Sequence, residues 1–72
     1  MDRDAWLMAA SLLEEHGKEA AAIICAQIVT LHHTVEAMPN AEDAALLRFW
    51  AETGAALLAI IEEKAAGPQA IQ

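Results

Sequence analysis

The apolar residues of the N-terminal segment recur at helical spacing and do not alternate, which predicts a helix over residues 3–15. At about 100° per residue, four apolar residues share one face of this helix: Trp6, Ala9, Ala10 and Leu13. A second apolar set falls off that face and is a candidate contact surface: Leu7, Met8 and Leu12. Gly17 fits the left-handed residue that closes a helix, so we expect this helix to end just before it.

A second helix is predicted over residues 18–37, because Pro39 disfavours helical geometry in the residue before it. Its apolar residues are spaced by four and three, which is a heptad seam: Ile24, Ile28, Leu31, Val35 and Met38. On the opposite side lie Ala22, Ala26 and Val29, and the sequence has no charged residue between Ile23 and Val35. A helix that is apolar nearly all round is a buried helix. We therefore expect this helix to be central in the fold, or to be covered by a second copy of the chain.

A third helix is predicted over residues 41–66. Asn40 begins it in a variant of the capping box with Asp43, and Gly67 followed by Pro68 is expected to stop it. Its expected core face consists of seven residues: Leu46, Leu47, Trp50, Gly54, Leu57, Leu58 and Ile61. A glycine inside a helix costs about 1 kcal/mol relative to alanine. Gly54 therefore indicates either close packing under a large neighbouring side chain, such as a tryptophan, or a bend in the helix.

Together these patterns predict an all-α fold, a three-helix up-down-up unit built on the long hairpin of the second and third helices. One domain is expected over residues 1–68, with residues 69–72 as a frayed tail. A chain of 72 residues buries only about 60% of its unfolded surface, and such thin cores gain stability from regular helix packing or oligomerisation. Because the only cysteine, Cys25, excludes an internal disulfide, we expect a homodimeric bundle.

The charge balance narrows the classes of partner. The chain has 11 acidic and 4 basic residues, a formal net charge of −7. Binding to nucleic acids or to anionic membranes requires lysine and arginine, so neither is an expected partner. The segment Met1-Asp2-Arg3-Asp4 is too acidic for a signal peptide, and no apolar run approaches the roughly 18 residues of a membrane span. A lone cysteine fits a reducing compartment, and we expect a cytoplasmic protein.

Several short signals are spread along the chain: Trp6, His16-Gly17, Ala20, Gln27-Ile28 and Trp50. In these the sequence resembles a bacterial family of short, uncharacterised all-helical proteins, a domain of unknown function. It departs from that family by a longer stretch between Ile28 and Trp50. The resemblance implies a helical fold and assigns no activity.

The residues capable of chemistry are poorly placed for it. Metal ligands on one helix need a spacing of three or four residues, whereas Cys25 and His32 are seven residues apart and His32 and His33 are adjacent. The same spacing argues against a Cys25–His32 nucleophile and base. We expect Cys25 to be a small buried hydrophobe and His16 to favour the C-terminal dipole of the first helix. The sequence therefore predicts no catalytic residues, no metal, no cofactor and no enzyme.

Acidic residues gather where antiparallel helices bring the same end of the bundle together. This acidic pole consists of Glu14, Glu15, Glu19, Glu62 and Glu63. The first two and the last two are expected in or near last turns, where the helix dipole disfavours carboxylates. One interpretation is a solubilising surface. The other is a binding site for a basic partner protein, as in a small acidic regulator or an anti-CRISPR-like phage or plasmid inhibitor. The alternative class is a structural protein whose role is its own oligomer, with Leu7, Met8, Leu12, Ala22, Ala26 and Val29 as contacts.

Overall fold

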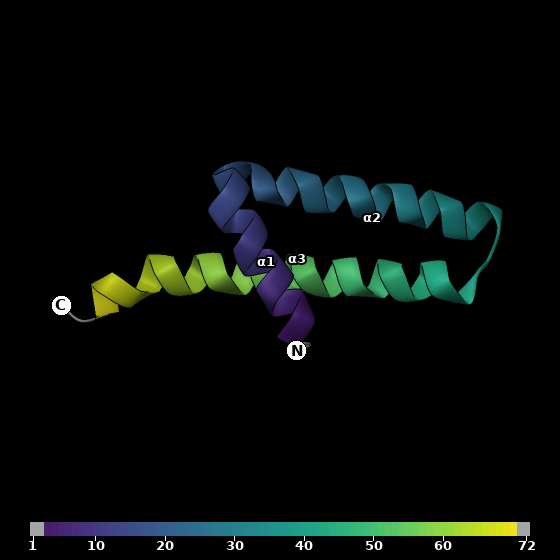
Figure 1. The fold of residues 1–72 in the computed structure, drawn as a ribbon. Helices are drawn as coiled ribbons and strands as arrows, with labels where there is room; N and C mark the ends of the chain where they lie inside the picture. Colours follow the sequence, from purple (N-terminus) through teal and green to yellow (C-terminus); the bar gives the residue numbers. More distant parts are fainter. Residues whose placement is uncertain (1–2, 71–72) are drawn as a thin grey trace.

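The structure is a computed structural model that describes the backbone of residues 3–70 and the side chains of residues 3–64. Helix α1 spans Arg3–His16, a single 3-10 turn η1 spans Gly17–Glu19, α2 spans Ala20–Ala37 and α3 spans Ala41–Ala70. The predicted all-α class is confirmed. Two long helices, α2 and α3, run antiparallel beside each other and are joined by residues 38–40 (Figure 1).

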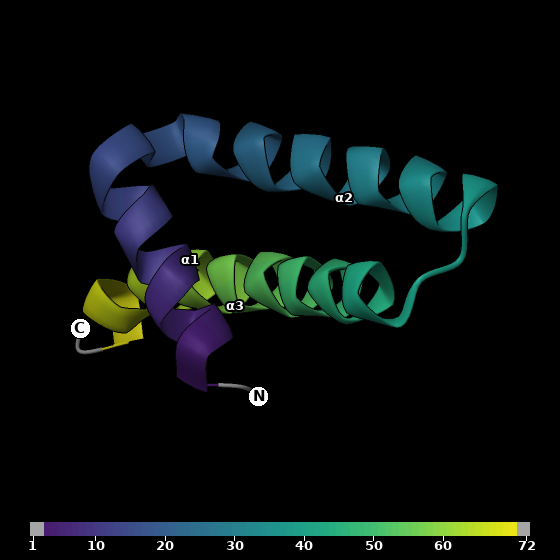
Figure 2. The same ribbon diagram turned by 45° about the vertical axis from the view of Figure 1, so that its right-hand side comes forward.

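Helix α3 is the central helix of the fold. It contacts both α1 and α2, and α1 lies across it near the open end of the hairpin, inclined to it in both views (Figures 1 and 2). The molecule is elongated, with principal extents of 52 × 22 × 16 Å. The expectation that α2 is central within one chain is wrong, since only Ala20 and Ile24 are buried on it. Its place at the outer side of the hairpin leaves most of its apolar circumference exposed.

The helix ends follow the sequence signals at two places and depart from them at a third. Gly17 has a φ of +59°, the left-handed conformation that closes α1. The Asn40 side chain caps α3, because its Oδ1 accepts hydrogen bonds from the amides of Glu42 at 2.8 Å and Asp43 at 3.3 Å. By contrast, α3 continues to Ala70, past Gly67 and Pro68. The φ that proline imposes is compatible with a helix, but a proline inside a helix removes one backbone hydrogen bond and its ring clashes with the carbonyl four residues earlier, so α3 continues past Pro68 at a local cost in stability. Of the predicted tail, residues 71–72 lie outside the described residues.

Small side chains form most of the core. Ala5, Ala9, Ala20, Thr53 and Ala56 are all completely buried. The larger members of the core are Ile24, Leu57 and Ile60, with Leu12, Leu13, Ile28 and Trp50 packed against them. The Thr53 hydroxyl donates a hydrogen bond of 2.8 Å to the carbonyl of Phe49 one turn earlier, so its burial leaves no unpaired polar group. Methyl-sized side chains on α1 and α3 allow the two backbones to pass close to each other.

The buried faces of α1 and α3 are rotated from the predicted ones. On α1 the buried residues are Ala5 and Ala9, and Leu12, expected to be off the core, is partly buried against it. On α3, Leu57 is buried as predicted, whereas three expected core residues are largely exposed: Leu46, Leu58 and Ile61. α1 crosses the side of α3 that carries Thr53, Ala56 and Ile60, and Leu58 and Ile61 lie on another side of the helix. Leu46 is on the same side as Thr53 but about two turns before it. The helix is continuous through Gly54, so the alternative of a break there is not realised.

Candidate functional site

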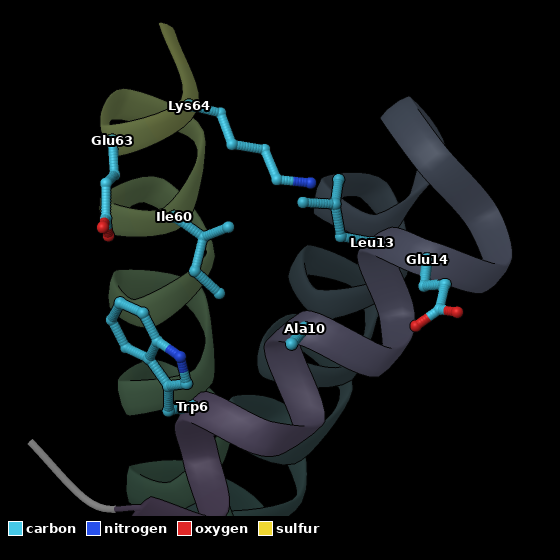
Figure 3. A pocket seen from close by; sticks show the side chains of 7 residues that line it. All are labelled: Trp6, Ala10, Leu13, Glu14, Ile60, Glu63 and Lys64. Carbon is cyan, nitrogen blue, oxygen red and sulfur yellow. The ribbon is translucent and has the colours of Figure 1, made fainter. Parts of the chain in front are cut away.

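A groove lies between α1 and α3, with a cavity volume of about 510 Å³. This α1–α3 groove is lined by Trp6, Ala10, Leu13, Glu14, Ile60, Glu63 and Lys64. Figure 3 shows the Trp6 ring beside Ile60 at one end and the Lys64 side chain reaching across towards Leu13 at the other. The floor is therefore apolar, and charged side chains stand at its edges. That volume falls in the range of about 300–1,000 Å³ typical of ligand pockets.

Two members of the acidic pole flank this groove from different helices. Glu14 belongs to α1 and Glu63 to α3, and both side chains are exposed at the groove (Figure 3). The other three members do not line it. Glu15 lies 3.8 Å from the ring of His16, Glu19 belongs to the turn η1, and Glu62 is exposed elsewhere on α3. Two residues of the acidic pole, Glu14 and Glu63, therefore flank the groove, and the other three lie outside it. The sequence did not predict the apolar floor of this groove. Trp6 and Ile60 belong to different helices, and only the crossing of α1 over α3 brings the two side chains together.

The position of Glu62 and Glu63 within α3 differs from the predicted one. Because α3 reaches Ala70, these two residues lie before its last turn, where the dipole no longer opposes a carboxylate strongly. Glu14 and Glu15 are in the last turn of α1, as predicted, followed by His16 at its end. The dipole argument therefore applies to the α1 members of the pole alone.

A second groove runs along another side of α3, against α2, with a volume of about 250 Å³. This α2–α3 groove is lined by Ala21, Ile24, Cys25, Ile28, Gly54, Leu57, Leu58 and Ile61. None of these residues carries a formal charge at neutral pH. Gly54 is one of the lining residues, and it brings no side chain into the space between the two helices. The surface is therefore almost wholly apolar although solvent reaches it.

The predicted contact residues fall into three groups. Leu7 and Met8 are exposed on α1, at 52% and 36%. Ala22, Ala26 and Val29 are exposed on α2, and Val29 adjoins Ile28 in a shallow hollow with His32 and His33. Leu12 packs against the core and is not a free contact. The exposed residues Leu58 and Ile61 beside α2 were expected in the core, and the structure adds them to the surface.

The residues tested for chemistry stay apart. Cys25 is exposed in the α2–α3 groove, so its predicted burial is wrong: it lies about 100° round the helix from the buried Ile24. His32 pairs with Glu36 at 2.9 Å on the surface of α2, and the His32 and His33 rings are 6.3 Å apart edge to face. Within the described residues no three side chains of the metal-binding types come together.

Two stretches of the described chain, Arg3–Ala37 and Ala41–Lys64, are long and apolar enough to cross a membrane by length and composition alone. This differs from the expectation that no such stretch exists, because alanine raises the apolar content of both without adding large side chains. Core helices of water-soluble proteins meet the same criterion, although these helices are mostly exposed. One or two such helices are weak evidence for a membrane span.

Comparisons with protein-family models, curated proteins and solved structures give no match. The resemblance to a bacterial family of short helical proteins stays a prediction. The two grooves on α3 are thus the observations on which a functional argument can rest.

Proposed function

We propose that this protein is a small, acidic, non-enzymatic regulator or inhibitor in the cytoplasm that docks on a basic surface of a partner protein. The observation that carries the proposal is that Glu14 and Glu63 flank an apolar floor from two helices, which gives the groove two carboxylates against the single ammonium group of Lys64. Apolar contacts supply affinity, and the flanking carboxylates select a basic segment and speed its approach. An amphipathic helix with apolar anchors and basic flanks has the matching chemistry.

The size and the net charge of −7 also resemble those of small acidic inhibitors that occupy nucleic-acid-binding grooves of other proteins, anti-CRISPR proteins among them. This is an analogy of size and charge. It makes a phage or plasmid anti-defence role the most specific form of the proposal.

The test compares two double variants within the same pole. Glu14→Gln with Glu63→Gln removes the flanking pair, and Glu15→Gln with Glu62→Gln makes the same charge change outside the groove. The probe is a labelled helical peptide with leucines on one face and lysines beside them, against a scrambled peptide of equal composition. We expect the first variant to bind the helical peptide roughly 2- to 30-fold more weakly at low salt, since two exposed pairs contribute about 0.2–1 kcal/mol each.

The difference between the variants should shrink as salt is added, because exposed charges are screened over about 8–10 Å. Equal losses in both variants, or equal binding of both peptides, would contradict a specific site. The pole would then be a solubilising surface.

The second candidate is a structural role in which three-helix units associate as a homodimeric bundle. It is favoured by a different observation, the exposed apolar residues along α2 and α3, which include Val29, Leu58 and Ile61. Sedimentation equilibrium at micromolar concentration should give twice the chain mass. Replacing Glu14 and Glu63 should weaken partner binding in the first candidate and leave the oligomer intact in the second.

A further inference from the structure

The two ends of the α1–α3 groove differ in their chemistry. At one end the carboxylate of Glu63 points back along α3 towards the Trp6 ring, the direction that side chains on a helix normally take (Figure 3). At the other end the Lys64 side chain extends across the groove towards Leu13 and away from that ring (Figure 3). Among the described lining residues, the single cationic group is therefore directed away from the end that carries Trp6 and Glu63.

Trp6 occupies a position that core packing does not explain. Its side chain is 36% exposed, although tryptophan is highly buried on average. Among the described residues, neither the buried core nor the apolar side chains packed against it include Trp6. The face of an indole ring carries negative electrostatic potential and attracts a cation. Arg3, three residues earlier on α1, does not line the groove, so the cation suited to this end is one that a partner supplies.

We propose that this end of the groove binds an arginine side chain of the partner, with the guanidinium group stacked on Trp6 and donating hydrogen bonds to Glu63. The inference rests on the proposed docking of a basic partner in this groove, and it names the side chain that is recognised. A guanidinium group is planar and weakly hydrated, so it stacks on an aromatic ring, and it can donate two parallel hydrogen bonds to one carboxylate. A lysine ammonium group is compact and strongly hydrated, so it gains mainly the charge attraction.

Glu14 contributes to binding in a different way. It lies eight residues after Trp6 on α1, roughly 12 Å along the helix axis. A guanidinium group on the Trp6 ring is thus too far away to hydrogen-bond to Glu14, which attracts lysine and arginine alike. Trp6 and Glu63 are the residues that distinguish arginine from lysine.

Two peptides of equal charge test this assignment. One is the helical peptide with leucines on one face and lysines beside them, and the other has arginine in place of every lysine. The parent protein is expected to bind the arginine peptide about 2- to 5-fold more tightly, the gain from a cation–π contact at an exposed site. Trp6→Leu keeps an apolar side chain without a ring and should bring the ratio of the two dissociation constants towards one. Trp6→Phe keeps a ring and should retain part of the preference.

The two carboxylates provide a matched pair of variants. Glu63→Gln should lower the ratio, because the guanidinium group loses a charged acceptor with two oxygens. Glu14→Gln should weaken the binding of both peptides and leave the ratio unchanged. Circular dichroism checks that all variants remain helical, and the comparison of the two peptides on the parent protein needs no variant.

The outcomes separate this inference from the proposed function. Equal binding of the two peptides by the parent protein, with both weakened when Glu14 and Glu63 are replaced together, would overturn the arginine site and leave the docking of a basic partner standing. A preference for arginine that persists in Trp6→Leu would also overturn the site. Binding of neither peptide would overturn the docking and the arginine site together.

Discussion

Gly54 of α3 faces Ile24 of α2 so closely that a Cβ at Gly54 would lie 3.4 Å from Cγ2 of Ile24. That distance is ordinary van der Waals contact, so a methyl group at this position fits against Ile24. The neighbour is an isoleucine and not the tryptophan that the sequence suggested. The contact with Ile24 shows how closely α2 and α3 approach each other beside the α2–α3 groove.

Gly54→Ala should therefore stabilise the fold by up to about 1 kcal/mol, because alanine has the higher helix propensity. Gly54→Leu should destabilise it by about 1–3 kcal/mol through overpacking against Ile24. Urea unfolding followed by circular dichroism measures both free energies. Equal stabilisation by the two substitutions would mean that the helices separate freely at this level.

The cap of α3 gives a second prediction. Asn40→Ala should lower the free energy of unfolding by about 0.5–2 kcal/mol, since Oδ1 no longer accepts from the amides of Glu42 and Asp43. Asn40→Asp retains an acceptor at the same place and is the control that should stay near the parent value. If the Asn40→Ala and Asn40→Asp variants have the same free energy of unfolding, these two hydrogen bonds do not contribute to stability.

The third prediction concerns the crossing of α1 and α3. Ala9 is completely buried, so Ala9→Leu should destabilise the protein by about 1–3 kcal/mol because no space exists for three more carbons. Ala45→Leu, at an exposed position of α3, is the matched control and should change stability little. Similar losses in the two variants would contradict a tight crossing.

The fourth prediction separates the two helices that supply the acidic pole. Glu14→Gln should raise stability by about 0.3–1 kcal/mol at low salt, because the carboxylate opposes the dipole in the last turn of α1. Glu62→Gln should have little effect, since α3 continues to Ala70 beyond it. The gain from Glu14→Gln should fall as salt screens the interaction. An equal gain from Glu62→Gln would indicate that α3 ends in solution near the predicted residue 66.

The sequence predicts the helical class and most helix ends because these depend on local signals. Gly17 ends α1 through its own backbone conformation, and Asn40 begins α3 through hydrogen bonds from its side chain to nearby amides. Both roles can be inferred without knowing the fold. The sequence predicts the buried faces of the helices less accurately than it predicts the helix ends. When alanine occupies so many positions, periodicity does not distinguish the face of Thr53, Ala56 and Ile60 from the face of Leu58 and Ile61. The direction in which α1 crosses α3 decides between them, and that is a tertiary property.

The candidate site likewise has features that the sequence predicts and features that depend on the tertiary structure. That Glu14 and Glu63 belong to one end of the molecule follows from antiparallel helix order. That Trp6 and Ile60 form an apolar floor between them depends on the inclination of α1, which no spacing encodes. Cys25 was expected in the core because its neighbours are apolar, but the surface that it borders is apolar as well.

The core of methyl-sized side chains has a consequence for how this sequence can change over generations. At Ala5, Ala9, Ala20 and Ala56 a smaller residue can only be glycine, which weakens a helix, and a larger one separates the backbones. These four positions therefore tolerate neither a smaller nor a larger side chain without a loss of stability. Sequence drift is confined to the outer faces of the helices, so divergent descendants of this chain would be recognised by the spacing of their alanines sooner than by their large residues.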